Sequence, residues 1–177
     1  IIKRYFSNNK KPAAIISFDD GHKDIVKNAL PILSSLNIPF NVNINTEIIE
    51  TKKPQDFTRV YDILNFSDIK EYYNPELMTE PIIIDRTKPF EVEKKFTDIL
   101  SNLSYEKKRI FTNHLHQWSN TNNSVFSKVL STEDIQLLSN YKVEFGSHSH
   151  THPILSKCND DEIHYELLQS KKILENI

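Results

Sequence analysis

Residues 13–45 carry a strand–helix–strand pattern that leaves few folds open to this chain. The apolar, β-branched run over residues 13–18 predicts a buried strand. Apolar residues then recur at helical spacing over residues 25–36, although Pro31 is expected to kink or divide this helix. Residues 40–45 alternate between apolar and polar, as in a strand with one buried face. Two strands joined by a helix predict a parallel sheet or barrel.

The same α/β pattern returns near the C-terminus. Ser131 and Asp134 resemble a capping box that begins a short helix, and residues 141–145 predict a further strand. Asn159 and Glu162 are spaced to cap a final helix. One apolar stripe of this helix is expected to pack against the sheet, namely Ile163, Leu167, Ser170, Leu174 and Ile177.

The intervening residues have a different character. We interpret residues 50–130 as a mostly helical insertion into one domain that spans residues 1–177. Helices are predicted at 66–73, 90–102 and 105–117, a short strand at 81–84, and a polar loop at 119–124.

Composition excludes several classes of function. The 22 basic and 24 acidic residues give a net charge of −2, so no basic field draws the chain to nucleic acid or to an anionic membrane. No apolar run is long enough for a transmembrane segment. The single cysteine, Cys158, excludes an internal disulfide and a cysteine-rich zinc site. A single cysteine is compatible with a cytoplasmic or a cell-envelope location. The sequence does not indicate the oligomeric state.

Two adjacent carboxylates, Asp19 and Asp20, follow the first predicted strand. Sites in parallel α/β folds are built at strand ends. Two carboxylates this close resist ionising together unless a cation is present. One of them can therefore serve as a metal ligand and the other as a base. The alternative is that Asp19, Asp20 and Gly21 form an ordinary turn.

Three histidines, His148, His150 and His152, lie within residues 148–153. Pro153 argues against a helix through this segment, so we expect the histidines on a loop at a strand end. Imidazoles bind zinc and similar metals, and two histidines with one carboxylate leave a position open for water or substrate. The alternative is a solvated loop or a pH-sensitive patch.

Glycine is scarce, and both glycines border these motifs. Gly21 follows the two aspartates and Gly146 precedes His148 by two residues. We infer that glycine is kept where the backbone needs a positive φ or a close approach beside the site.

The polar face of the second strand is expected to present three amides. Asn41, Asn43 and Asn45 occupy that face. They are expected either to bind sugar hydroxyls or to be partly solvated or hydrogen-bonded to neighbouring backbone.

Together, Ser17-Phe18-Asp19-Asp20-Gly21 and the segment from Gly146 to Pro153 resemble the polysaccharide deacetylase family, also called the NodB homology or carbohydrate esterase 4 family. The resemblance covers roughly residues 11–46 and 131–177. It implies a distorted (β/α) barrel of the NodB type, here incomplete at the C-terminus. By position, it makes Asp19 the general base and Asp20, His148 and His152 the ligands of a divalent ion, most often zinc. His150 has no role in the family, and we expect it behind the ligands or at the surface.

The implied reaction is the metal-dependent removal of N-acetyl groups from an amino sugar or polysaccharide. Two alternatives remain: a non-catalytic member of the fold that binds a glycan or a protein, and an amidohydrolase of a small non-sugar amide. The later motifs of the family, including its histidine general acid, cannot be placed in residues 1–177. The chain starts without methionine and stops inside a predicted helix, so we expect artificial ends and little turnover from this piece alone.

Overall fold

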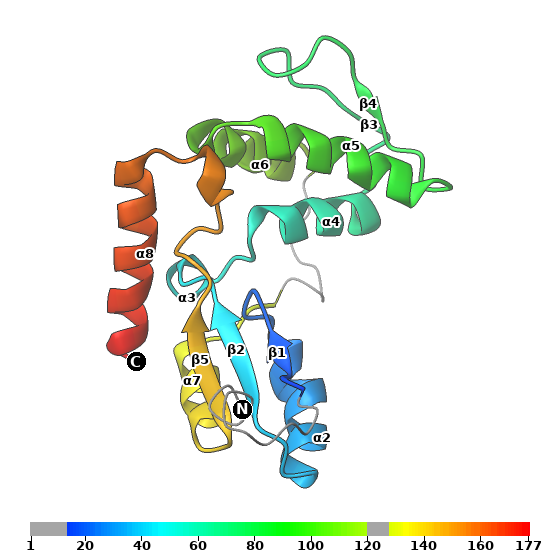
Figure 1. Ribbon diagram of the computed structural model, residues 1–177. Helices are drawn as coiled ribbons and strands as arrows, with labels where there is room; N and C mark the ends of the chain where they lie inside the picture. Colours follow the sequence, from blue (N-terminus) through cyan, green and yellow to red (C-terminus); the bar gives the residue numbers. More distant parts are fainter. Residues whose placement is uncertain (1–13, 120–127) are drawn as a thin grey trace.

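Three parallel strands form the centre of the fold in the computed structural model, which describes residues 14–119 and 128–177 (Figure 1). Strands β1 (Ser17–Phe18), β2 (Phe40–Ile44) and β5 (Val143–Ser147) lie in the order β1-β2-β5. Phe18 lies opposite Val42, and Ile44 lies opposite Ser147. The predicted parallel α/β architecture is therefore confirmed, and the strands of the described residues form an open sheet rather than a closed barrel.

Burial along the strands follows the predicted alternation in β2 but not in β1. Phe40, Val42 and Ile44 are buried in the core of the sheet. The expectation that residues 13–18 form a buried strand is wrong over the described part: Ile15 is 56 % exposed, because β1 is short and pairs only with β2 among the described residues. Residue 13 lies outside the described residues.

Pro31 divides the first helical segment, as predicted. A π-helical turn, η1 (Ile25–Ala29), is followed by α2 (Leu30–Ser35), and Pro31 stands in the first turn of α2. Proline is tolerated there because the first N–H groups of a helix have no partner within it. After β2 the chain forms the short helix α3 (Glu47–Thr51).

Both predicted capping boxes are present. Ser131 and Asp134 cap α7 (Thr132–Ser139), and Asn159 and Glu162 cap α8 (Asp160–Glu175). The strand between these helices begins at Val143, two residues later than predicted, where its pairing with Phe40 begins. A single 3-10 turn, η2 (Leu155–Lys157), precedes α8.

Helix α8 packs against β5 through a face that is rotated from the predicted stripe: Ser170 and Leu174 face the core as expected, but Leu167 does not. Leu167 is 50 % exposed, whereas Glu166 and Ser170 are fully buried, and Ile173 and Leu174 contact the core. The rotation has a physical reason: the Glu166 carboxylate bonds to the turn after β5, as described below, and it must face inward to do so.

The middle of the chain forms a layer of helices above the carboxyl ends of the strands (Figure 1). This helical layer (residues 56–119) contains α4 (Asp56–Phe66), α5 (Pro89–Asn102), α6 (Tyr105–Ser119) and the antiparallel pair β3 (Glu71–Tyr72) and β4 (Ile82–Ile83). Its own apolar core is Val60, Ile63, Leu64, Tyr72, Ile82, Ile84, Val92, Phe96, Leu100, Phe111 and Leu115.

The helix predicted at residues 66–73 is wrong. Helix α4 ends at Phe66, Ser67 is extended, and Tyr72 pairs with Ile82 in the small sheet. Burial of Tyr72 in the apolar core of the helical layer favours this strand over a continued helix. The other predicted elements of this region are observed as α5, α6 and β4. Of the predicted loop at 119–124, Ser119 ends α6 and the remainder lies outside the described residues.

No helix within residues 14–119 or 128–177 combines the length and apolar character needed to cross a membrane.

Candidate metal centre

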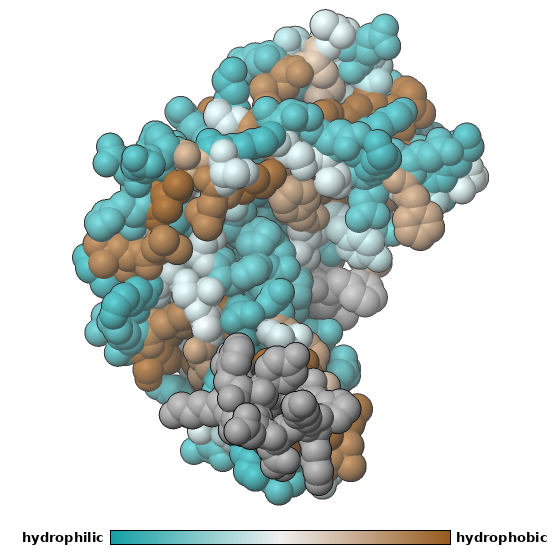
Figure 2. Space-filling model, in the orientation of Figure 1, coloured by the Kyte–Doolittle hydropathy of each residue, from teal (hydrophilic) through white to brown (hydrophobic). Residues whose placement is uncertain are grey.

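The two sequence motifs meet at the carboxyl edge of the sheet. Asp20 follows β1, and His148 directly follows β5. These two strands flank β2 and run parallel, so their carboxyl ends lie at the same edge. Polar side chains gather there, between the helical layer and the sheet (Figure 2).

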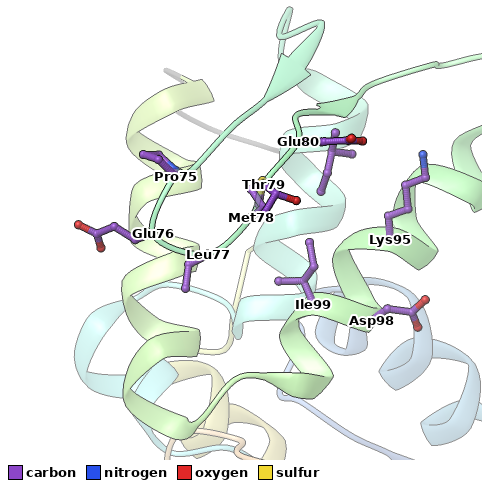
Figure 3. Close-up of a pocket in the computed structure, with 10 residues that line it drawn as sticks. Pro75, Glu76, Leu77, Met78, Thr79, Glu80, Lys95, Asp98 and Ile99 are labelled. Atoms are coloured by element: carbon purple, nitrogen blue, oxygen red, sulfur yellow. The ribbon is translucent and has the colours of Figure 1, made fainter.

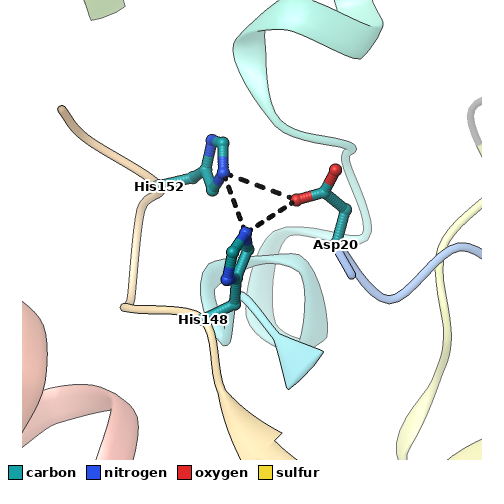
Figure 4. Close-up of side chains that lie close together, drawn as sticks. All are labelled: Asp20, His148 and His152. Atoms are coloured by element: carbon teal, nitrogen blue, oxygen red, sulfur yellow. Dashed lines mark hydrogen bonds and ion pairs between the residues drawn. The ribbon is translucent and has the colours of Figure 1, made fainter. Parts of the chain in front are cut away.

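Asp20, His148 and His152 form a compact group of possible metal ligands (Figure 4). Asp20 Oδ1 lies 3.6 Å from His148 Nε2 and 3.5 Å from His152 Nε2, and the two imidazole nitrogens are 3.2 Å apart. An ion with ligand distances of about 2.0–2.1 Å and tetrahedral angles separates its ligand atoms by about 3.4 Å. The three atoms therefore have the spacing of ligands that share one ion.

Two buried polar atoms of these side chains lack hydrogen-bond partners within the described part of the chain, and one of them, Asp20 Oδ1, is a ligand atom of the group. Asp20 Oδ1 is buried and has no hydrogen-bond partner among the described residues, and the same holds for His152 Nδ1. A buried carboxylate oxygen without a partner is costly unless a cation satisfies it. Burial lowers the pKa of His152, against the opposing effect of Asp20, and so favours the neutral imidazole that binds metals. The donor set thus fits a divalent ion.

Unusual backbone conformations cluster at this site. Asp20 (φ 67°), Ser149 (φ 64°) and His152 (φ 61°) have positive φ although none is glycine. Gly21 (φ 66°) has the same conformation, and a Cβ on it would come 2.5 Å from Ile48. Such strain is retained where surrounding contacts enforce it, and here it occurs at two of the three possible metal ligands.

Asp19 is held apart from the Asp20 group by the polar face of β2. The amide of Asn43 donates a hydrogen bond of 2.7 Å to Asp19 Oδ1 and one of 3.2 Å to Ser17 Oγ. Asp19 is exposed, and it does not belong to the group of possible metal ligands. Gly146 lies directly opposite Asn43, and a Cβ there would overlap Asn43 Oδ1. A side chain at either glycine would therefore crowd a neighbouring side chain at this edge of the sheet.

The three amides expected on the polar face of the second strand differ in their surroundings, and Asn45 lies just after the end of β2. Asn41 accepts a hydrogen bond from Ser17, Asn43 bonds to Ser17 and Asp19, and Asn45 is 2 % exposed. The contacts of Asn41 and Asn43 agree with the alternative of hydrogen bonds to neighbours, although the partners are side chains.

A buried carboxylate holds the turn that carries the histidines. Glu166 of α8 is fully buried and accepts hydrogen bonds from the backbone N–H groups of His150 and Thr151, each at 2.7 Å. It also accepts one from the Thr151 hydroxyl at 2.6 Å. His150 lies behind the ligands, 5 % exposed, and its Nδ1 lies 3.0 Å from the Thr46 hydroxyl.

The helical layer also contacts this turn. Lys108 of α6 donates a hydrogen bond of 3.1 Å to the carbonyl of His152 and is 5 % exposed. Asp56 and the Phe57 ring lie beside its ammonium. Burial lowers the pKa of Lys108, while Asp56 and Glu166 act in the opposite direction.

These positioning groups were not identified from the sequence. A lysine on a polar helix and an amide on a strand resemble many surface residues. Two features could have indicated such roles. Gly146 lies opposite Asn43, and Glu166 lies within the final helix.

A separate, open depression of about 630 Å³ lies on the surface of the helical layer, between the 75–80 turn and α5 (Figure 3). Ile99 of α5 points toward this turn, and Lys95 and Asp98 also line the depression. It shares no lining residue with the Asp20 group, and we assign it no function.

Comparison with known proteins gives one match. A family model described as polysaccharide deacetylase matches residues 89–177. The matched region includes His148 and His152, and it begins after Asp19 and Asp20. No curated protein and no solved structure matched the chain.

Proposed function

The chain belongs to the polysaccharide deacetylase family, and from this premise we propose that it is a metal-dependent hydrolase that removes N-acetyl groups from an amino sugar or polysaccharide. The observation that carries this proposal is the spacing of Asp20, His148 and His152, whose ligand atoms all lie within 4.8 Å of one another. Two imidazoles and one carboxylate leave a coordination position open, as catalytic zinc sites do.

We assign the metal to Asp20, His148 and His152, with zinc as the ion that best suits this donor set. A bound divalent ion would polarise the acetamide carbonyl and lower the pKa of water. The chain's own part is to hold the Asp20 carboxylate and the two imidazoles close together, with their ligand atoms turned toward one another. Glu166 and Lys108 support this arrangement by fixing the turn between the histidines.

Asp19 is assigned as the general base that removes a proton from the attacking water. The Asn43 amide bonds to one oxygen of Asp19 and leaves the other for this transfer. Hydrolysis adds the water oxygen to the acetyl carbon and breaks the C–N bond. The products are acetate and a free amine, which gains a proton.

Membership of the family also supports a proposal about the fold. We interpret the three-stranded sheet as part of a distorted NodB-type barrel, within a single domain over residues 1–177. Residues 50–130, which include the helical layer, are interpreted as an insertion beside the catalytic edge.

The test is acetate release from N-acetylglucosamine oligomers by the zinc-loaded chain. We expect slow release that is lost on chelation, in His148→Ala and in Asp19→Asn. Asp19→Asn is expected to retain zinc, because the side chain of Asp19 is not in the ligand group. Zinc-independent release, or release that survives both substitutions, would contradict the proposal.

Two other results would favour the alternatives. Oligomer binding without zinc-dependent acetate release favours a non-catalytic glycan-binding protein. Faster hydrolysis of simple amides than of any sugar favours an amidohydrolase of small non-sugar substrates.

A further inference from the structure

The turn that carries the histidines (residues 148–152) pairs in its first half with residues 44–47, where β2 ends and α3 begins. Three backbone hydrogen bonds of 2.9–3.2 Å join the two segments, each from an N–H group to a carbonyl: His148 to Ile44, Thr46 to Ser149, and Glu47 to His150. They continue the pairing of β2 with β5 beyond the ends of both strands. Residues 44–47 therefore set the direction in which the turn leaves the sheet.

The Thr46 side chain adds a contact with the middle of this turn. Its hydroxyl lies 3.0 Å from His150 Nδ1, and because a hydroxyl can donate or accept, the bond forms with either tautomer of the imidazole. Thr46 is fully buried and His150 is nearly so, which shields the bond from water. On α8, the ring of Tyr165 packs edge-on against the imidazole of His150, with 5.7 Å between ring centroids. His150 is therefore held between Thr46 and α8.

Glu47 links the same segment to the helical layer. Its carboxylate pairs with the guanidinium of Arg109 on α6. The preceding residue of α6, Lys108, donates a hydrogen bond to the carbonyl of His152 at the end of the turn. Helix α6 thus holds one end of the turn directly, and it holds the first half through Glu47.

The turn needs such support because its backbone is strained. Ser149 (φ 64°) and His152 (φ 61°) both have positive φ. Conformations of this kind cost about 1–3 kcal/mol each and persist only where surrounding contacts enforce them. If the contacts were lost, the turn would relax, and the two imidazole nitrogens that now lie 3.2 Å apart would separate.

We propose that Thr46 and Arg109 are positioning residues of the metal centre, which keep its two imidazoles at the spacing of ligands that share one ion. Thr46 acts through His150, and Arg109 acts through Glu47. Neither Thr46 nor Arg109 belongs to the ligand group. The proposal rests on the proposed function for the assignment of the metal, and it adds two side chains from outside both sequence motifs to that site.

The first test is the zinc affinity of Thr46→Val, measured by competition with a chromophoric chelator. Valine has nearly the shape of threonine, but it cannot hydrogen-bond to His150. We expect zinc affinity to fall about tenfold, at the lower end of the range for a group that orients metal ligands. Thr46→Ser keeps the hydroxyl and should retain most of the affinity. Unchanged affinity in Thr46→Val would overturn the proposal for Thr46.

A spectroscopic readout separates positioning from a general loss of stability. Cobalt(II) bound in place of zinc has visible absorption bands that depend on ligand geometry, and we expect these bands to change in Thr46→Val. Ser67→Ala is the matched control, because Ser67 is buried and its hydroxyl bonds to the Ile63 carbonyl at the end of α4. It should lower stability in urea and leave the zinc affinity and the cobalt bands unchanged. An equal loss of zinc affinity in Ser67→Ala would contradict a positioning role for Thr46.

Arg109→Met is an independent test at a partly exposed position, where the substitution leaves the buried contacts of Thr46 in place. The Arg109 side chain is 41 % exposed and that of Glu47 is 23 % exposed, so solvent screens the pair and we expect a smaller loss of zinc affinity, about threefold. Arg109→Lys keeps the charge and should lose less. Lys94→Met breaks the exposed pair of Lys94 with Asp98 in α5 and should bind zinc normally. Equal zinc affinity in Arg109→Met and the unaltered chain would contradict the assignment of Arg109.

Failure of this inference is distinguishable from failure of the proposed function. Zinc binding that depends on Thr46 and Arg109, without acetate release from any sugar, contradicts the proposed function alone. Zinc-dependent acetate release, with the same zinc affinity and the same cobalt bands in every variant, contradicts this inference alone. An unaltered chain that binds no zinc contradicts both.

Discussion

Replacing Glu166 by glutamine tests how the metal-binding turn is held. Glu166 is fully buried and accepts three hydrogen bonds, of 2.6–2.7 Å, from His150 and Thr151. Both residues lie between the two histidines that we assign as ligands. Glutamine has nearly the same shape, but it replaces one carboxylate oxygen with an NH2 group. That group cannot accept the hydrogen bonds it would face.

The size of the effect follows from these contacts. A hydrogen bond to a charged group contributes about 1.5–3 kcal/mol, and a buried N–H left without a partner costs about 1–3 kcal/mol. We therefore expect Glu166→Gln to lower the free energy of unfolding by about 2–4 kcal/mol. Loss of a group that orients metal ligands typically lowers metal affinity by about 10–100-fold, and we expect a decrease of this size for zinc.

Zinc affinity is measured by competition with a chromophoric chelator, and stability by urea unfolding of the metal-free protein. Glu175→Gln is the control, because Glu175 is exposed at the end of α8 and pairs only with Lys171 in the described structure. A surface pair of this kind contributes at most about 1 kcal/mol. If Glu166→Gln binds zinc as tightly as the unaltered chain, Glu166 does not position the ligands.

Two further substitutions test neighbouring contacts. Gly146→Ala should lower the free energy of unfolding by about 1–3 kcal/mol, because the added Cβ would overlap Asn43 Oδ1. In urea unfolding, the double variant that also carries Asn43→Ala should recover most of this loss. If it does not, the strain does not come from the contact with Asn43. Lys108→Met removes the donor to the His152 carbonyl and should weaken zinc binding about tenfold, or about 1.4 kcal/mol. Lys108→Arg should weaken it less, and equal affinities in all three proteins would show that the helical layer does not support the site.

The sequence predicted the features that depend on local pattern. Strict alternation over residues 40–45 corresponds to β2, and both capping boxes begin the helices that they were expected to begin. Asp20 and His148 follow strands that run parallel, so their meeting at one edge follows from topology alone.

Features that depend on tertiary contacts were not predictable. Residues 66–73 have no strong helical or strand pattern, and burial of Tyr72 against Ile82 decides the outcome. In α8 we expected Leu167 rather than Glu166 to be buried, because apolar residues are buried more often than charged ones. The three hydrogen bonds of Glu166 favour its burial instead, and these bonds form only in the folded turn.

The same limit applies to the site. Residue type and spacing indicated a metal site made of histidines and a carboxylate, since few other groups bind zinc, and the family resemblance selected Asp20, His148 and His152 as the ligands. The contacts of Asn43 with Asp19 and of Lys108 with the His152 carbonyl join residues far apart in the chain. Neither residue carries a chemical signature that marks such a role.

X-ray absorption at the zinc edge of the metal-loaded protein tests the central claim most directly. One zinc per chain, with two imidazole nitrogens and at least one oxygen at about 2.0–2.1 Å, is the predicted result. His148→Ala and His152→Ala should each remove one imidazole from that shell. A shell without imidazole, or one that neither substitution changes, would contradict the assignment of Asp20, His148 and His152 as the metal centre.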